Sequence, residues 1–345
     1  MTDVFNVKAS LSDRHHYLMN GDKMNFKKLL FALVLGSVIG ASVQAAGYPE
    51  KTITAVVPFP PGGSTDMIAR AIGPKLTQKL GQPFIIENKA GATGAIGATY
   101  VKNAPADGYT IMVASIGVWA VNPHLQKNLS YDPSKDFDLL TVAVRAPNVL
   151  VVNPNLPVNS VPDLIAYLKK NPEKTSFGTS GAGSSDHLTT ALFWQQTGTT
   201  GLHVPYKGGA PVLTDLMGGH ADASFQNINV VLQHIKSGKL KALAITGDQR
   251  SPLLQNVPTL NEAGVKGVDV YSWQAVGAPK GLPKDVKAKL HDAISSALND
   301  PDLKARLVEQ GFEVVANTPE EFTTFQAQEL ARWKKVIEVG KIPVD

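Results

Sequence analysis

The chain has 345 residues, of which 18% are charged, a formal net charge of +4 and no cysteine. The absence of cysteine excludes disulfides, cysteine-ligated zinc and thiol catalysis. The small net charge gives no reason to invoke nucleic acid or an anionic membrane surface as a partner.

The first 45 residues are expected to lie outside the fold. From Met24 a short basic segment precedes an apolar run to about Ala41, and Val43-Gln44-Ala45 fits the rule of small residues before a cleavage site. We interpret Met24–Ala45 as a secretory signal peptide and residues 1–23 as an over-long start. The apolar run is too short to span a bilayer as a mature helix, although a membrane anchor is the alternative. We therefore expect an exported, soluble protein.

In the remaining chain, short β-rich runs alternate with amphipathic helices. The first half has predicted strands at 52–57, 83–88, 109–115, 138–144 and 148–153, and predicted helices at 67–80 and 92–103. The second half has predicted strands at 175–180, 201–206, 221–227, 240–246 and 270–279, and helices after Ser160, from about Ser185, and at 209–219 and 229–238. The last helices are predicted at 283–299, 301–310 and 319–339. This alternation indicates parallel sheets covered by helices on both faces.

The helices after residue 280 have no new sheet to cover, so we expect them to pack on the first sheet by way of the strand at 270–279. The prediction is a two-lobe α/β fold, each lobe a mostly parallel sheet flanked by helices. Lobe 1 would comprise residues 46–147 and 272–345, and lobe 2 residues 148–271. The two crossings would lie near 145–150 and 268–274. A single large sheet is the alternative topology.

Two turns share one pattern, "PFPPGGSTD" after the first strand and "SFGTSGAGSSDHLTT" at 176–190. In each, a strand ends in a turn rich in glycine and hydroxyl groups, and the turn leads into a helix. Glycine lets the backbone approach a ligand, and the N–H groups at the start of a helix attract an anion. Ligands of open α/β sheets bind beyond the carboxyl ends of the strands. Two such turns that face each other would clamp a small anion, without a lysine or arginine in either turn.

Motifs of catalysis and of cofactor binding are absent from the sequence. Neither turn has the lysine of a Walker A motif, and Asp186 stands where a dinucleotide fingerprint needs its third glycine. No Gly-x-Ser-x-Gly occurs, and the eight histidines are dispersed without metal-binding spacing. We expect a binding protein with no cofactor and no metal, rather than an enzyme. An exported α/β hydrolase using Ser180 or Ser185 is the alternative.

Nine further motifs occur in a fixed order: "YPEKTITAVVPFPPGGSTDMIARAI", "IENKAGATGAIGA", "NAPADGYTIMVAS", "NPHL", "YDPSKDF", "HVPYKGGAP", "GKLKALAIT", "VPTLNEAG" and "APKGLPKDVKAKL". With these motifs the chain resembles the Bug family, the periplasmic solute receptors of tripartite tricarboxylate transporters, from about residue 48 to 340. The resemblance implies two α/β lobes that close on a small carboxylate. It also implies a transient partner, which is a membrane permease or, in some members, a signalling system. We expect a monomer.

The resemblance further implies that the two turns hold the carboxylate, largely through backbone N–H groups and ordered waters. The ligand-binding positions that it implies are Phe59, Gly63, Ser64, Asp66, Ser115, Thr179, Ser180, Gly183, Ser184 and His187. Helix capping is the alternative role for Ser64 and Ser184, core packing for Phe59, and a buried hydrogen bond for His187. Asp66 would repel a carboxylate, so we expect it to organise the loop or its waters. Trp119 and Trp273 are either structural or line the cleft.

One position departs from the family pattern. Many members carry an acidic residue where this chain has Gln226, between Phe225 and Asn227. The resemblance implies that an acidic group there could pair with the ammonium of an amino acid, and glutamine carries no charge. We therefore include Gln226 among the ligand-binding residues and expect a ligand without an ammonium group. A di- or hydroxycarboxylate, or an aromatic acid, fits this expectation.

Overall fold

The computed structural model describes residues 47–340 and residue 342, so the predicted signal peptide, Met24–Ala45, lies outside the described residues. From Tyr48 onward the chain forms one compact unit. Among the described helices, none is both long enough and apolar enough to cross a membrane.

The first sheet contains the amino-terminal strands and one strand from late in the chain. Its strands are β1 (Ile53–Val57), β2 (Phe84–Asn88), β3 (Thr110–Ser115), β9 (Tyr271–Pro279), the first part of β4 (Phe137–Val152) and the short β10 (Glu313–Val314). Its helices are α2 (Ser64–Leu80), α3 (Ala95–Lys102), α9 (Lys284–Leu298), α10 (Pro301–Glu309) and α11 (Pro319–Gly340). Helix α9 packs on α2 and β4, which places the carboxyl-terminal segment on this sheet.

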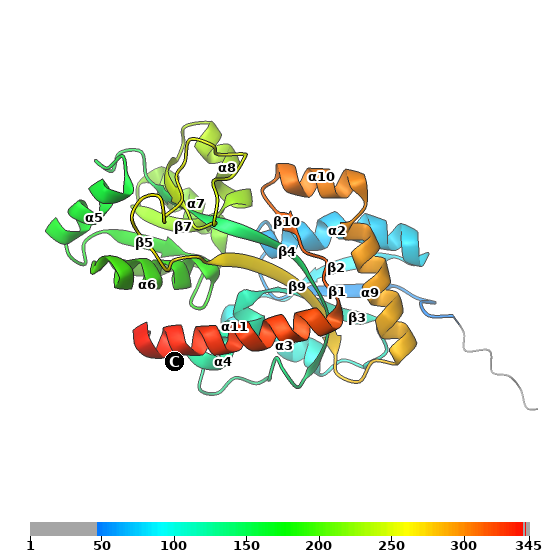
Figure 1. Cartoon of the computed structure of the whole chain (residues 1–345). Coiled ribbons are helices and arrows are strands. Elements are labelled where there is room, and N and C mark those ends of the chain that lie inside the picture. The colour runs from blue at the N-terminus through cyan, green and yellow to red at the C-terminus, as the bar shows by residue number, and fades with distance from the viewer. Residues whose placement is uncertain (1–46, 341, 343–345) are drawn as a thin grey trace, which may run out of the picture. The chain divides into compact units, whose positions relative to one another are not determined.

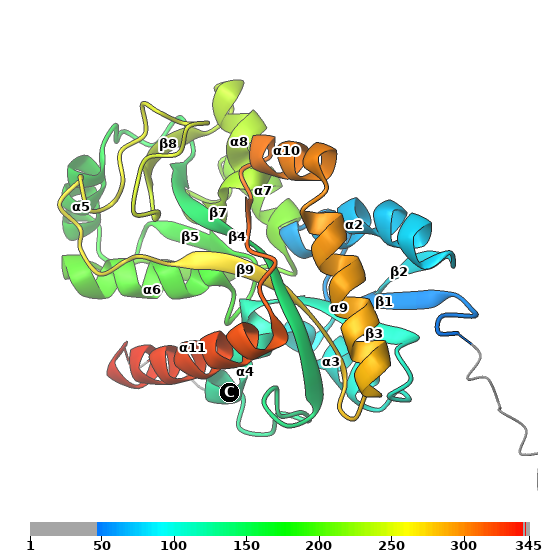
Figure 2. The same cartoon turned by 45° about the vertical axis from the view of Figure 1, so that its right-hand side comes forward.

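The second sheet is built around the last residues of β4. Its other strands are β7 (Ala223–Asn227), β8 (Lys241–Ile245), β5 (Ser176–Thr179) and β6 (Leu202–Pro205). Its helices are α5 (Val161–Lys170), α6 (Ser185–Thr197), α7 (Gly209–Gly218) and α8 (Ile228–Lys236). In Figures 1 and 2 these four helices surround one end of β4, whereas α2 and α9 lie towards its other end. The expected two α/β lobes are therefore observed.

Strand β4 corrects one prediction. We expected two strands, at 138–144 and 148–153, but β4 is one strand of 16 residues. It pairs with β9 as far as Pro147 opposite Tyr271, and with β7 from Asn148 opposite Asn227. The residue before a proline prefers extended backbone, which lets the strand continue through this point. Eight strands are consequently linked in the order β2-β1-β3-β9-β4-β7-β5-β6, and β8 and β10 pair with β4 beside this path.

Parallel pairing is restricted to the outer strands. β1 pairs in parallel with β2 and β3, and β5 with β6 and β7. The two long strands β4 and β9 run antiparallel to their neighbours, so each sheet is mixed. The expectation of mostly parallel sheets thus describes the outer strands only.

The two tryptophans with open roles are structural. Trp119 is 0% and Trp273 2% exposed, and both lie in the hydrophobic core. Trp119 belongs to a π-helical turn, η2 (Gly117–Val121), which continues into α4 (Asn122–Leu125), a segment for which no helix was predicted. Glu329 of α11 accepts hydrogen bonds from the indole N–H groups of Trp273, at 2.9 Å, and of Trp333, at 3.0 Å. This carboxylate fastens α11 to β9.

Candidate ligand-binding site

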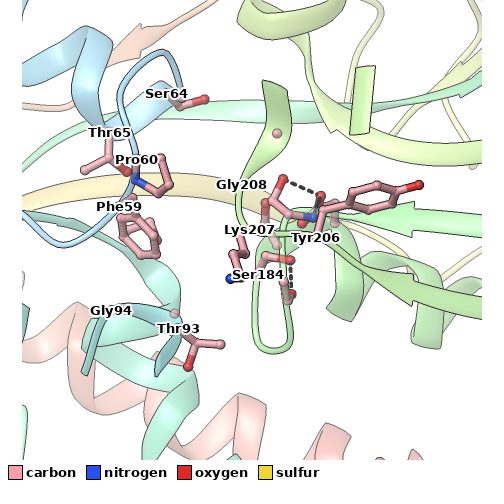
Figure 3. Close-up of a pocket in the computed structure, with 18 of the residues that line it drawn as sticks. Phe59, Pro60, Ser64, Thr65, Thr93, Gly94, Ser184, Tyr206, Lys207 and Gly208 are labelled. Carbon is pink, nitrogen blue, oxygen red and sulfur yellow. Dashed lines mark hydrogen bonds between the residues drawn. The ribbon is translucent and has the colours of Figure 1, made fainter. Parts of the chain in front are cut away.

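A cavity of about 490 Å³ lies at the carboxyl ends of β1, β3, β5 and β6, where ligands of α/β sheets bind. Residues of both sheets line it. They come from the β1–α2 turn, the loop at 90–94, the start of η2, the β5–α6 turn, the β6–α7 turn and the end of β7. Figure 3 shows Phe59, Pro60 and Thr93 on one side of this space and Ser184 and Lys207 on the other.

Nine of the eleven predicted ligand-binding residues line this cavity: Phe59, Gly63, Ser64, Asp66, Ser115, Ser180, Gly183, Ser184 and Gln226. Their contact with a ligand remains a prediction. Thr179 and His187 are not among the lining residues. Both are buried beneath the second turn, at 0% and 8% exposure.

Thr179 and His187 support the second turn from below. The Nδ1 atom of His187 accepts a hydrogen bond from the Gly183 N–H at 3.1 Å. Its ring stacks on that of His203 at 4.2 Å, and His203 Nε2 lies 2.7 Å from Thr179 Oγ1. Burial, together with the neighbouring imidazole, lowers the pKa of His187 to about 3. The ring is therefore neutral and keeps an acceptor for Gly183, which matches the alternative role of a buried hydrogen bond.

In the first turn, Ser64 does not cap its helix. Gly63 is the N-cap of α2, and no side chain caps this helix. The Ser64 hydroxyl instead reaches across to the second lobe, where it lies 2.8 Å from Asn227 Oδ1 and 3.2 Å from Asn229 Oδ1. Ser64 thus connects the turn after β1 with the segment after β7.

Asp66 organises the same turn, as we expected. Its carboxylate accepts hydrogen bonds from the Gly62 N–H at 3.0 Å, from Arg70 Nε at 2.9 Å and from Asn88 Nδ2 at 3.0 Å. Burial alone would raise the pKa of Asp66, but these donors outweigh it and lower the pKa. The negative charge of Asp66 is therefore paired inside the protein and is not directed at the cavity.

In the second turn, Ser184 does cap its helix. Its Oγ accepts from the His187 N–H at 3.4 Å and donates to the Gly181 carbonyl at 2.6 Å. The φ angle of Gly183, +77°, is one that other residues rarely adopt, and an added Cβ would lie 3.1 Å from Leu125. Glycine is thus required for the turn to approach the first lobe this closely.

The buried carboxylate of Asp186 explains the departure at Gln226. Asp186 Oδ2 accepts from the N–H and the hydroxyl of Ser180, at 2.7 and 2.8 Å, and from Gln226 Nε2 at 2.7 Å. Burial raises the pKa of Asp186, although the hydrogen bonds from Ser180 oppose the effect. An acidic residue at position 226 would place a second carboxylate against Asp186. Glutamine supplies a donor there, so its amide is committed to the second turn.

Sequence reasoning missed a third turn, Tyr206-Lys207-Gly208, between β6 and α7. The Tyr206 N–H donates to the Thr179 carbonyl at 2.8 Å, and the Gly208 N–H to the Ser180 carbonyl at 3.1 Å, so the third turn is fastened to the second. Among the lining residues in the described chain, Lys207 alone carries a cationic side chain. The two predicted turns contain no lysine or arginine, but this third turn adds a cationic side chain to the lining of the cavity. The segment "HVPYKGGAP" has the same strand–glycine turn–helix pattern and was the signal that could have found it.

The floor of the cavity was also missed. Ser272 and Gln274 of β9 line it, and Gln274 lies opposite Ser115 of β3 in the strand register. The two lobes approach closely here, because a Cβ added to Gly117 would lie 3.2 Å from the Gly183 carbonyl oxygen. Strand β9 was predicted as a crossing between the two lobes. Its pairing with β3 and β4 decides which of its side chains face the cavity, and the sequence does not give that pairing.

Comparisons with known proteins give the family. A family model described as tripartite tricarboxylate transporter family receptor matches residues 68–341. Protein BugT of Bordetella pertussis is 38% identical over 318 residues, which cover 91% of this chain and 98% of BugT. The solved structure "R. palustris Rpa4515 with adipate" is 38% identical with a TM-score of 0.84, and the match covers 87% of this chain and 100% of that one. The structure "MatC (Rpa3494) from Rhodopseudomonas palustris with bound malate" is 32% identical with a TM-score of 0.80, over 84% of this chain and 100% of that one. The resemblance to the Bug receptors is thereby confirmed, and the chain belongs to the tripartite tricarboxylate transporter receptor family.

Proposed function

We propose that this protein is a periplasmic receptor that captures a small carboxylate, namely a di- or hydroxycarboxylate or an aromatic acid, for a tripartite transporter. The observation that carries the proposal is the cavity between the first turns of α2 and α6. The first N–H groups of a helix have no partner within the helix, and they attract an anion. The titles of two related structures name bound adipate and malate, which supports a carboxylate as the ligand class.

The proposed ligand is held by the turns and released by a movement of the lobes. The pairing of β4 with β9 ends at Pro147 opposite Tyr271, and its pairing with β7 begins at Asn148. We propose that these two strands form the hinge between lobe 2, residues 148–271, and lobe 1, residues 46–147 and 272–345. The closed receptor, delivered to the periplasm by its signal peptide, would then dock as a monomer on membrane permease subunits.

The geometry gives little support to the hydrolase alternative. The Ser180 hydroxyl donates to Asp186, and the Ser185 hydroxyl lies 3.4 Å from Asn148 Oδ1. The nearby imidazole of His187 accepts from a backbone N–H rather than from a serine. A nucleophile needs a base that is free to take its proton. The Asp186 carboxylate beside Ser180 already accepts from a backbone N–H and from the Gln226 amide, and Ser185 faces an amide. A sensor that signals through a partner protein would use the same clamp, and affinity measurements would not separate it from a transport receptor.

A thermal-shift screen of residues 46–345 tests the proposed function. The panel holds mono-, di-, tri- and hydroxycarboxylates, aromatic acids and amino acids. A ligand at 100 times its Kd stabilises the folded state by about 2.7 kcal/mol, which raises Tm by several degrees at this size. Stabilisation by acids without an ammonium group is the expected result. Stabilisation by amino acids alone would contradict the proposed ligand class.

Two glycine variants provide a matched comparison. Gly183 and Gly198 lie at opposite ends of α6, and both have positive φ, +77° and +60°. Gly183→Ala adds a methyl group in the second turn, whereas an added Cβ at Gly198 meets nothing within 4 Å. Both variants carry backbone strain, but only Gly183→Ala should lose the thermal shift with the ligand. Equal losses in the two variants would contradict this location of the site.

A further inference from the structure

The acidic and basic side chains of the cavity differ in how the protein pairs them. The lining contains two aspartates, Asp66 and Asp186, and one lysine, Lys207. The carboxylate of Asp66 accepts three hydrogen bonds from the protein and that of Asp186 four, and Asp66 also forms an ion pair with Arg70 at 2.9 Å. By contrast, the ammonium of Lys207 forms no ion pair with any carboxylate in the described part of the chain. The two aspartates are therefore engaged by donors of the protein, whereas Lys207 has no carboxylate partner among the described residues.

Lys207 is held at the edge of the cavity by a fixed backbone. The residues on either side of it, Tyr206 and Gly208, donate backbone hydrogen bonds to the Thr179 and Ser180 carbonyls. The Tyr206 hydroxyl is anchored to Asp215 at 2.6 Å. Figure 3 shows the Lys207 side chain extending from this turn into the space between the lobes, beside Ser184. Lys207 thus belongs to the β6–α7 turn and not to either of the two turns that would hold a first carboxylate.

We propose that Lys207 is a specificity-determining residue, which selects ligands that carry a second anionic group. This inference rests on the proposed function and adds a role for one side chain. The first carboxylate lies on the backbone N–H groups of the turns, and the second faces the Lys207 ammonium. Closure of the lobes removes water around this pair and strengthens the attraction. With both aspartates paired inside the protein, the cavity has no free carboxylate to receive a ligand ammonium, so diacids are preferred to amino acids.

The test compares acids that differ only in the second carboxylate. Calorimetry on residues 46–345 measures Kd for succinate against butyrate and for adipate against hexanoate. The variants are Lys207→Met, which keeps the length of the side chain, and Lys207→Arg, which keeps the charge. The control is Lys174→Met, because Lys174 is an exposed lysine just before β5, at the end of that strand remote from the turns.

We expect Lys207→Met to weaken diacid binding about threefold to tenfold and to leave monoacid binding unchanged. Lys207→Arg and Lys174→Met should keep the preference for diacids, and added salt should reduce it in the wild type. Equal changes for diacids and monoacids in Lys207→Met, or no change for either, would overturn the inference. Failure of the proposed function would look different, since the wild type would then bind no acid of the wider screening panel.

Discussion

Protonation of His187 should destabilise the protein at acid pH. Its pKa is lowered from 6.5 to about 3 in the folded state by burial and by the adjacent His203 ring. Between these two values the unfolded state binds more protons, so this contribution to stability is fully present above pH 6.5 and is lost as the pH falls towards 3. A protonated Nδ1 also cannot accept the hydrogen bond from Gly183. From linkage, the loss between pH 7 and pH 5 is about 2 kcal/mol for this one group.

Urea unfolding followed by tryptophan fluorescence at pH 5, 6 and 7 measures this effect. Other groups also titrate, so the informative quantity is the difference between wild type and His187→Asn. Asparagine has a polar atom near the position of Nδ1 and does not titrate in this range. The free energy of unfolding of His187→Asn should be lower than that of the wild type at every pH, because part of the ring is missing. It should fall less steeply than that of the wild type as the pH drops below 6.5. His220→Asn, on the surface, serves as the control. Parallel pH profiles for wild type and His187→Asn would refute the reasoning.

Three further substitutions test packing and hydrogen bonds elsewhere. Gly97→Ala should lower the free energy of unfolding by about 1–3 kcal/mol, because the added Cβ would lie 2.7 Å from the Pro58 side chain. An unchanged midpoint of urea unfolding would contradict this close approach. Ser64→Ala removes the contact with Asn227 and should weaken carboxylate binding by about 1 kcal/mol in calorimetry. An unchanged Kd would show that the bound state does not use this contact. Glu329→Ala leaves two buried indole N–H groups unpaired and should lower the free energy of unfolding by about 2–5 kcal/mol. Glu329→Gln keeps an acceptor and should lower it less. Equal losses in the two variants would show that these hydrogen bonds do not stabilise the fold.

Local sequence patterns were sufficient to predict the elements and the two main turns. The strands at 52–57, 83–88 and 109–115 were predicted within a residue or two of β1, β2 and β3. This was possible because the pattern that distinguishes a strand from a helix is contained in a short segment of the chain. Glycine-rich turns are likewise visible along the chain, so most of the predicted lining residues face the cavity. The break predicted inside β4 was wrong, because pairing with β9 and β7 keeps residues 145–147 extended.

The sequence by itself determined the fold class, the family and the glycine turns, since each depends on residues that are close together in the chain. Tertiary structure decided which side chains reach the cavity. Gln226 meets Asp186 across 40 positions, and Ser64 meets Asn227 across 163. The ring of His187 lies beneath the second turn and accepts a hydrogen bond from it. Lys207, in the third turn, adds a cationic side chain to the lining of the cavity. Such contacts depend on strand register and on the approach of the two lobes, and no local pattern in the chain encodes them.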